Sequence, residues 1–341
     1  MSTADVVEIV VKSLVIILAL LTGFAYMTWF ERRVIARLQS RVGPNRVGPS
    51  GLLQPLADGV KLMFKEDIVP AEADKVLYLL APLVTVVSAI MAFAIVPVGP
   101  SVTLFGRTVA LHLADMNIAL LYFLGLGSLG VYGVVLAGWA SNNKYALLGG
   151  LRASAQMISY ELAMGLAVLS VVMLAGSLSL VDIVNAQAGG RWFILLQPVA
   201  FLIFLVTMIA ETKRAPFDLP EAEQELVAGF HTEYSGMKFA LFFMGEYIAM
   251  IAISGVAVSL FLGGWRGPFA EQVPILGVLY FFVKLVAFLF FFVWLRATLP
   301  RLRYDRLMHL GWKVLLPLSL ANVVVTAIAV VARDTGFFGL G

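Results

Sequence analysis

The sequence contains no cysteine and only three histidines, His112, His231 and His309. Without thiolates the chain cannot ligate an iron–sulfur cluster through cysteine or form a disulfide. No pair of these histidines falls within the apolar segments of the chain, so the two axial ligands of a membrane haem are missing as well. Any redox chemistry must therefore take place on a partner.

Charged residues are also scarce. They make up 13% of the chain, and the mean hydropathy is +0.94. Because ordinary soluble domains are about 25% charged, these values exclude a soluble globular protein. Eight apolar segments have the roughly 20 residues that a helix needs to cross a bilayer. They cover residues 6–30, 76–98, 116–138, 155–176, 192–211, 238–262, 274–296 and 313–332.

None of these segments alternates between apolar and polar residues, as the strands of a membrane β-barrel would. The expected fold class is therefore all-α: a polytopic membrane protein of about eight transmembrane helices, forming a single integral membrane domain over residues 1–341.

Positive charge is distributed unevenly between the connections. Of the 24 Lys and Arg residues, eighteen lie in or beside the connections after segments 1, 3, 5 and 7, and four lie in the alternate connections. Basic residues mark the cytoplasmic side of membrane proteins. We therefore expect loops 31–75, 211–237 and 297–312 to be cytoplasmic and both termini to face outward. The net charge of +3 reflects topology, not nucleic-acid binding.

The first cytoplasmic loop divides into three parts. Arg33, Arg37 and Arg41 repeat every four residues, which predicts one face of a helix continuing out of the first segment. The repeat "RVGPNRVGP" then breaks this helix with two Gly-Pro turns. The apolar spacing of residues 53–64 predicts an amphipathic helix in the membrane interface. The arginines either anchor the chain on the cytoplasmic side or line a basic vestibule at the membrane surface.

Three ionisable residues stand out inside the apolar segments: Glu161, Glu246 and Lys284. Such groups normally face the protein interior or water, and they often mark an ion pathway. One interpretation is a static Glu–Lys pair that locks helices together. The other is a proton path, because a single lysine cannot neutralise both glutamates and a carboxyl group of raised pKa can exchange protons.

Residues 211–234, "ETKRAPFDLPEAEQELVAGFHTEY", are unusually acidic. Asp218 and Glu221 fit a capping box, with Asp218 as the N-cap of a helix. One helix start does not account for Glu223, Glu225 and Glu233 as well. Crowded carboxylates titrate as a group, which favours a proton reservoir.

This stretch and three others resemble the family of quinone-contacting membrane subunits of respiratory complex I, which comprises the H-type subunit of bacterial NADH-quinone oxidoreductase and subunit 1 of the mitochondrial enzyme. The others are "ERRVIARLQSRVGPNRVGPSGLLQPLADGVKLMFKE", "GWASNNKYALLGGLRASAQMISYE" and "RATLPRLRYDRLMHLGWK". The resemblance extends from about residue 29 to residue 318. It implies that segments 2 to 6 are similar to one five-helix half of the antiporter-like subunits.

The resemblance also implies two sets of site residues. A quinone chamber that opens between the first span, the interfacial helix and the sixth span would be lined by Arg32, Arg41, Asp58, Phe230, Arg296, Arg301 and Arg303. A proton-coupling path would use Glu161, Glu211, Asp218, Glu221, Glu223, Glu225, Glu233 and Glu246. No metal site is expected.

Quinone would be the substrate, while NADH, FMN and iron–sulfur clusters would lie on partner subunits. The implied partners are the hydrophilic quinone-site subunits, including the one with the terminal iron–sulfur cluster, small membrane subunits and antiporter-like subunits, all in or on the bilayer of a bacterial inner membrane.

Two alternatives stay open at the level of sequence. A related membrane subunit of an energy-converting hydrogenase would use no quinone, and the long match of the first and third cytoplasmic loops argues against it. A stand-alone cation/proton antiporter would need only the buried Glu and Lys residues, and it leaves the large cytoplasmic loops unexplained.

Overall fold

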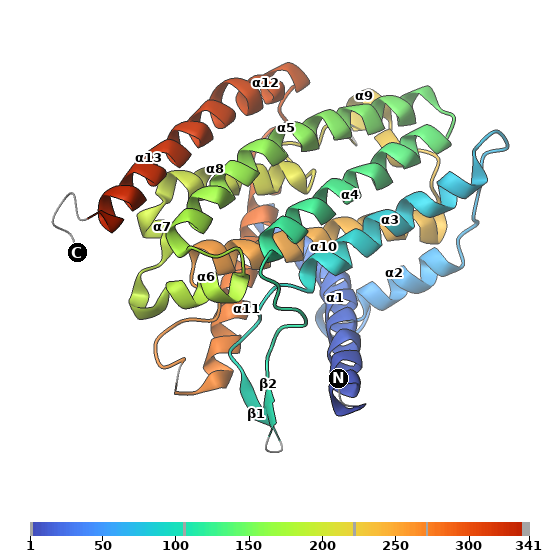
Figure 1. Ribbon diagram of the computed structural model, residues 1–341. Coiled ribbons are helices and arrows are strands. Elements are labelled where there is room, and N and C mark those ends of the chain that lie inside the picture. Colours follow the sequence, from blue (N-terminus) through green and yellow to red (C-terminus); the bar gives the residue numbers. More distant parts are fainter. Residues whose placement is uncertain (1–2, 105–106, 221–222, 271, 336–341) are drawn as a thin grey trace.

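A computed structural model describes residues 3–104, 107–220, 223–270 and 272–335. Seven of its helices are long and apolar enough to cross a membrane. They are α1 (Thr3–Leu38), α3 (Lys75–Phe93), α4 (Ala119–Ala140), α5 (Lys144–Ala175), α10 (Gly236–Phe261), α11 (Pro274–Thr298) and the continuous run of α12 (Tyr304–His309), the π-helix η4 (Leu310–Leu315) and α13 (Leu316–Asp334). The predicted all-α membrane fold is confirmed (Figure 1).

An eighth span is broken. The 3-10 turn η2 (Ala188–Gly190) and α7 (Phe193–Leu196) form a bent pair with α8 (Pro198–Glu211), at 70° to it. Pro198 lacks an N–H and pushes Gln197 before it out of helical geometry. The Gln197 amide donates to Thr326 Oγ1 at 2.9 Å and accepts from the Asn322 amide at 3.1 Å, so α13 supplies polar partners at the break. Backbone irregularity within a membrane needs such protein partners.

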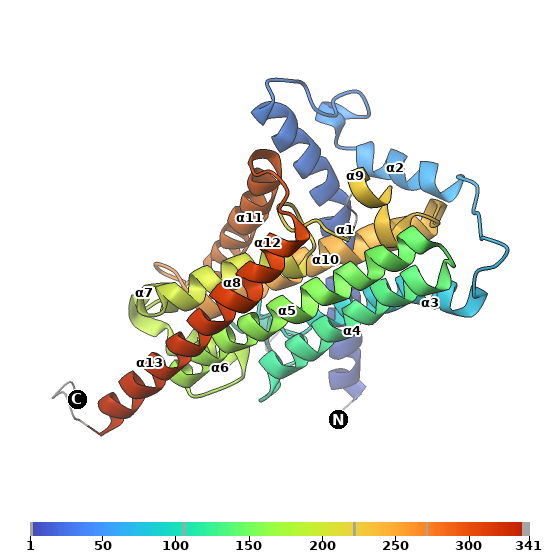
Figure 2. The same ribbon diagram turned by 90° about the horizontal axis from the view of Figure 1, so that it is seen from above.

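The short elements lie in the connections. They are η1 (Pro49–Gly51), α2 (Gln54–Met63), α6 (Leu180–Ala186), α9 (Glu223–Leu226), η3 (Gly229–His231) and an antiparallel pair of strands, β1 (Val102–Leu104) and β2 (Arg107–Val109). The strands were not predicted; their Val and Thr residues favour extended backbone. Both views place α2 and α9 toward one end of the molecule and α6 and α7 toward the other (Figure 2).

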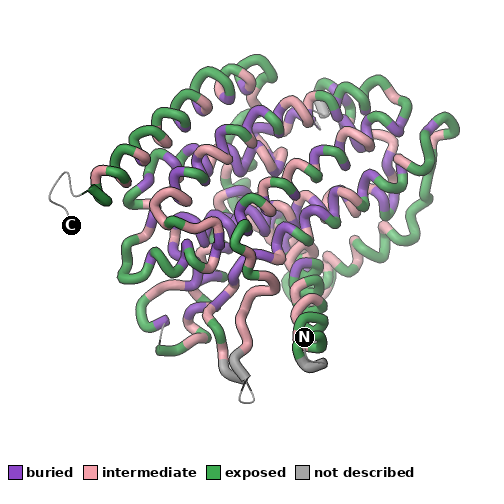
Figure 3. Tube along the Cα trace, in the orientation of Figure 1, coloured by how far each residue is buried: buried purple, intermediate pink, exposed green. Residues whose placement is uncertain are grey.

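Helices α3, α4, α5, α8 and α10 form the interior of the bundle. Helix α4 packs between α3 and α5, and α10 packs on α3, with α1 and α11 outside α10 and α13 outside α5. Gly133 and Gly245 allow the close approach to α3, because a Cβ on either would meet Thr85 at 2.2 Å and 2.8 Å. Small residues serve the same purpose in membrane helix pairs generally. The first turns of α1 are exposed (Figure 3).

Several predicted boundaries were wrong. Helix α5 begins at Lys144 instead of residue 155, because the Asn143 side chain caps it by accepting from the Tyr145 N–H at 2.8 Å. Glu161 therefore lies seventeen residues into its helix, where six had been predicted. Helix α1 ends at Leu38, so Arg33 and Arg37 share a helix and Arg41 does not.

The predicted amphipathic helix is present as α2. None of its residues is buried, and Leu56 and Met63 are 69% and 68% exposed. An apolar face of this kind suits a helix lying against the membrane surface, which stays a prediction.

Candidate functional site

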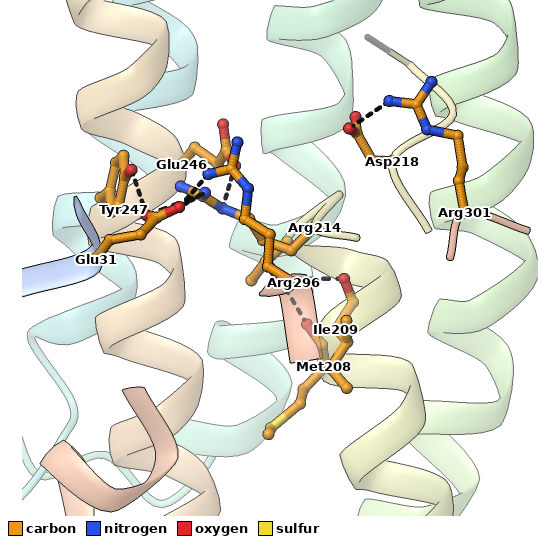
Figure 4. Close-up of polar contacts among 10 residues, drawn as sticks. Glu31, Met208, Ile209, Arg214, Asp218, Glu246, Tyr247, Arg296 and Arg301 are labelled. Carbon is orange, nitrogen blue, oxygen red and sulfur yellow. Dashed lines mark hydrogen bonds and ion pairs between the residues drawn. The ribbon is translucent and has the colours of Figure 1, made fainter. Parts of the chain in front are cut away.

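The turn after α8 directs Arg214 into the protein. The Arg214 N–H donates to the Ile209 carbonyl at 3.3 Å, and the Thr212 hydroxyl lies 3.1 Å from both the Met208 and Ile209 carbonyls. This closes the helix end and leaves Arg214 only 5% exposed. Figure 4 shows its guanidinium between side chains from α1, α10 and α11.

Arg214 joins two carboxylates, the buried Glu31 and the partly buried Glu246. Its Nη1 lies 3.3 Å from both carboxylate oxygens of Glu31 on α1, and its Nε lies 2.6 Å from Glu246 Oε1 on α10. The Tyr247 hydroxyl donates to Glu31 at 2.6 Å, and the Tyr247 ring lies under the guanidinium, 4.2 Å from its centre. Arg296 from α11 also pairs with Glu31. We call these five residues the Arg214 cluster; its two cations balance its two carboxylates.

The electrostatics of the cluster favour a permanently charged Arg214. Burial alone would lower the pKa of the guanidinium. The carboxylates of Glu246 and Glu31, together with Tyr247, outweigh burial and raise the pKa of Arg214 well above its usual value. Protonation changes in the cluster must therefore occur on a carboxylate.

A small cavity extends from the cluster into the bundle. Its volume is 80 Å³, and both Glu246 and Glu211 line it, together with Thr85, Ser88 and Phe230. A water molecule needs about 10–15 Å³ and two to four polar partners, so the cavity can hold a short chain of water between the two carboxylates. The end of α8 thus places Glu211 across a wettable space from Glu246.

Glu161 continues the series on α5. Its Oε1 lies 2.5 Å from the Ser128 hydroxyl on α4, and a Cβ on the adjacent Gly127 would lie 3.3 Å from Glu211 Oε1. The structure therefore brings together three of the predicted proton-coupling residues, Glu161, Glu211 and Glu246, on three different helices.

The acidic loop is not a single crowded group. Asp218 pairs with Arg301 at 2.8 Å, Glu225 with Arg152 at 2.5 Å, and Glu233 accepts from the Asn143 amide at 2.6 Å. Burial raises the pKa of Asp218, and Arg301 only partly offsets this effect. Asp218 was predicted as a helix N-cap, but α9 begins at Glu223, so its carboxylate serves Arg301 instead. Glu221 and the side chain of Glu223 lie outside the described residues.

The predicted quinone-binding residues fall into separate groups. Arg32 on α1 pairs with Asp58 on α2 at 2.8 Å, and Arg296 belongs to the Arg214 cluster. Arg301 holds Asp218, whereas the remaining two predicted arginines point into solvent. These are Arg41, which donates to Gln39, and Arg303, which pairs with Asp305. Phe230 is 5% exposed and lines the cavity between Glu211 and Glu246.

Sequence reasoning missed Glu31, Arg214 and Tyr247. Glu31 is the first charge after the first apolar segment, and Arg214 follows Glu211 by three residues, so both lie within the conspicuous motifs of the chain. A glutamate inside an apolar segment needs a cation as its partner, and this requirement could have directed the search from Glu246 to Arg214. The nearest basic residues before it are Lys238, which pairs with Asp67, and the Lys213–Arg214 pair.

Lys284 does not form the static pair with a glutamate that one interpretation required. Its Nζ donates to the carbonyls of Leu262, Gly264 and Arg266 at 2.7, 2.9 and 2.7 Å, and it lies 4.6 Å from the centre of the Trp192 ring. It therefore satisfies the carbonyls that follow α10.

Replacing Lys284 by methionine is expected to lower the thermal unfolding temperature of the purified protein complex. A buried carbonyl left without a hydrogen-bond donor lowers the free energy of unfolding by about 1–3 kcal/mol. The exposed Lys313→Met is the matched control and should leave the unfolding temperature unchanged. Equal unfolding temperatures for both variants would show that water replaces the Lys284 ammonium.

His231 lies in an aromatic cage formed by Phe230, Phe239 and Phe243, with ring centroids at 4.8, 5.3 and 6.1 Å. Burial and the charge of Lys213 lower the pKa of His231 to about 4. Since the usual pKa of histidine is about 6.5, the unfolded segment binds more protons between these values. The contribution of the neutral, buried His231 to the free energy of unfolding is complete above pH 6.5. It decreases by up to about 3 kcal/mol as the pH falls toward 4.

We therefore expect faster amide hydrogen exchange in the peptide spanning residues 226–234 at about pH 5 than at about pH 7.5, after correction for the intrinsic exchange rate. His231→Phe should remove this difference, and the exposed His309→Phe should keep it. Equal corrected exchange at the two pH values would contradict the buried neutral histidine.

Within the described residues no group of three or more His, Cys, Asp or Glu side chains could hold a metal ion.

Comparison with known proteins identifies the family. The family model "NADH dehydrogenase" matches residues 11–327. An H-type subunit of NADH-quinone oxidoreductase from Geobacter metallireducens is 59% identical over 322 residues, which cover 94% of this chain and 96% of the relative. An H-type subunit from Geobacter sulfurreducens is 60% identical over 315 residues, 92% and 94% of the two chains. The H-type subunit of Thermomicrobium roseum is 56% identical over 92% and 93%.

The identity extends over nearly the whole of each chain. The chain therefore belongs to the family of H-type subunits of NADH-quinone oxidoreductase and is a membrane subunit of bacterial complex I.

Proposed function

We propose that this subunit forms the membrane entrance and part of the wall of the quinone cavity, and that it couples quinone reduction to proton translocation through its buried carboxylates. The observation that carries the proposal is the Arg214 cluster. Arg296 is one of the predicted chamber residues, and it pairs with Glu31. The cluster connects this pair to Glu246 and to the cavity that Glu211 lines.

The entrance is supported by the junction of α1 and α2. Arg32 pairs with Asp58, and the side chains of Trp29 and Arg33 both donate to the Ser50 carbonyl. These contacts hold the amphipathic α2 beside α1, and α2 also contacts α10. An apolar molecule dissolved in the bilayer could enter beside the exposed apolar side chains of α2.

The electrons must come from a partner, because this chain has no redox centre. In the proposed arrangement a hydrophilic subunit with the terminal iron–sulfur cluster reduces quinone, while NADH and FMN are bound elsewhere in the complex. Reduction of quinone to quinol consumes two electrons and two protons. Protons drawn from groups around Glu31 and Arg296 change the charge that Arg214 experiences.

Arg214 then redistributes its pairing between Glu31 and Glu246. A stronger bond to Glu31 leaves Glu246 buried with a weaker counter-charge, which favours proton uptake by Glu246 from the cavity. Glu211 and Glu161 would carry the change onward, toward small membrane subunits and antiporter-like subunits. We assign Asp218 and the loop residues Glu221, Glu223, Glu225 and Glu233 to the supply of protons from the cytoplasmic side of a bacterial inner membrane.

Cross-linking tests the entrance. A photoreactive quinone, added to the intact complex in membranes, is expected to label residues 31–64 or 211–234, and excess unlabelled quinone should abolish the labelling. Labelling confined to other subunits would remove the entrance from this chain.

The relatives also bear on the alternatives. All three relatives described above are named as H-type subunits of NADH-quinone oxidoreductase, and each matches more than nine-tenths of this chain. This supports the quinone-linked function over the hydrogenase subunit and over the stand-alone antiporter.

A further inference from the structure

A long apolar groove runs along α1 on the side that faces α11. Its volume is 530 Å³, and its walls come from α1, α10, α11 and the segment after β2. The lining includes Ala19 and Gly23 of α1 and Phe282 and Leu289 of α11. From Lys12 to Phe30, both in the lining, the rise along the helix is roughly 27 Å, comparable with the hydrocarbon thickness of a bilayer.

The groove is smaller than an α-helix of the same length. An α-helix with its side chains is about 10–12 Å across, so a helix of this length would need roughly 2,500 Å³. That is more than the groove encloses, so a helix of a neighbouring subunit could lie over the groove but not within it. A single hydrocarbon chain is much thinner than a helix and suits a groove of this volume better.

The outer end of the groove carries charged and polar groups. Asp5, Glu8 and Lys12 lie on one face of α1, because they are three and four residues apart. Lys12 pairs with Glu8 at 2.6 Å, and both Lys12 and His112 line the groove. Burial lowers the pKa of His112, so its ring is a neutral hydrogen-bonding group at pH 7. Glu8 and Lys12 together carry no net charge.

His112 also lines a second, more polar cavity of 1040 Å³ between the loops of this end, where Asn185 and Arg266 are located. A hydrocarbon chain in the groove therefore ends beside a space wide enough for a lipid headgroup. The opposite charges of Lys12 and Glu8 suit a headgroup that carries both a phosphate and an ammonium, whereas a purely anionic headgroup would be repelled by Glu8.

We propose that this groove is a binding site for a zwitterionic phospholipid of the phosphatidylethanolamine type. One acyl chain lies between α1 and α11, the phosphate lies at Lys12 and His112, and the ammonium lies at Glu8. The inner end of the groove is at Phe30, one residue before Glu31. The lipid thus fills the path that would otherwise lead from the outward-facing surface of the inner membrane toward the Arg214 cluster.

The test uses the intact complex in nanodiscs that contain a phosphatidylethanolamine with a photoreactive group on one acyl chain. Adducts on Gly23, Phe282 and Leu289 report the groove, and adducts on Leu18, which is 63% exposed and outside the lining, report ordinary lipid contact. We expect the groove adducts to exceed the Leu18 adduct. Ala19→Trp fills the groove and should lower the groove adducts several-fold, while the matched Leu18→Trp leaves the groove adducts unchanged.

Four results would overturn the proposal: groove adducts that are no more frequent than ordinary contact adducts, groove adducts unchanged in Ala19→Trp, stronger groove labelling by a quinone with a photoreactive tail, or cross-links from the groove to another subunit. Equal labelling by phosphatidylglycerol and phosphatidylethanolamine probes would refute the assignment of the headgroup. The lipid site and the carboxylate path are independent, because the labelling does not depend on proton pumping.

Discussion

Replacing Arg214 by methionine is expected to destabilise the membrane arm by about 3–5 kcal/mol, because it leaves Glu246 without its closest cation and Glu31 with Arg296 alone. Arg214 and Glu31 are 5% and 4% exposed, so bulk solvent does not reach this part of the cluster. Thermal unfolding of the purified complex and the amount of assembled complex on native gels measure the effect. Arg152→Met breaks the partly exposed pair with Glu225 and serves as the control, with an expected cost below about 1 kcal/mol.

A second substitution separates charge balance from packing. In the double variant Arg214→Met with Glu246→Gln, the cluster loses one charge of each sign, and Glu31 keeps its pair with Arg296. The double variant should recover about 1–3 kcal/mol relative to Arg214→Met, as expected for residues in direct contact. If its stability equals the sum of the two single effects, Arg214 and Glu246 do not interact as the structure shows.

The largest functional effect is expected for Glu246→Gln. Glutamine keeps the shape of the side chain and can still accept a hydrogen bond from Arg214, but it cannot take up or release a proton. In vesicles with the reconstituted complex, we expect the number of protons pumped per NADH oxidised to fall toward zero. Quinone reduction measured with an uncoupler present should persist, because the electrons do not pass through this chain.

Glu72→Gln is the matched control for this experiment. Glu72 is exposed and bonds to the Asn142 amide at 3.0 Å, away from the cavity, so its loss should leave the pumping ratio unchanged. An unchanged ratio in Glu246→Gln would exclude Glu246 from the proton path, even if the variant is less stable.

Much of the fold could be predicted from composition and apolar segment length. The spans were found because hydrocarbon requires about 20 apolar residues per helix, and this rule depends only on local sequence. Helix ends outside the hydrocarbon depend on capping side chains instead. Helix α5 starts at Lys144 because Asn143 caps it. This start lies within a polar stretch, which hydropathy cannot assign to a helix. The break at Gln197 required knowledge of Asn322 and Thr326, more than 120 residues away.

The site was predictable where a single residue is conspicuous by itself. Glu161 and Glu246 stand out because a carboxylate inside an apolar segment is costly. The partners of such a residue are not conspicuous, since Glu31 and Arg214 lie at the ends of their segments, where charges are ordinary. Glu31 and Arg214 are 183 residues apart in the chain. Only the packing of α1 and α11 against α10 shows that they are in contact.

In the proposed mechanism, quinone reduction changes the protonation of the carboxylates around Arg214. Redox-difference infrared spectroscopy of the intact complex, in the region of the C=O stretch of protonated carboxyl groups, tests it most directly. We predict a band that appears or shifts on reduction of bound quinone, is lost in Glu246→Gln, and is retained in Glu72→Gln. A spectrum in which the Glu246→Gln variant shows the same carboxyl bands as the unaltered complex would contradict the claim.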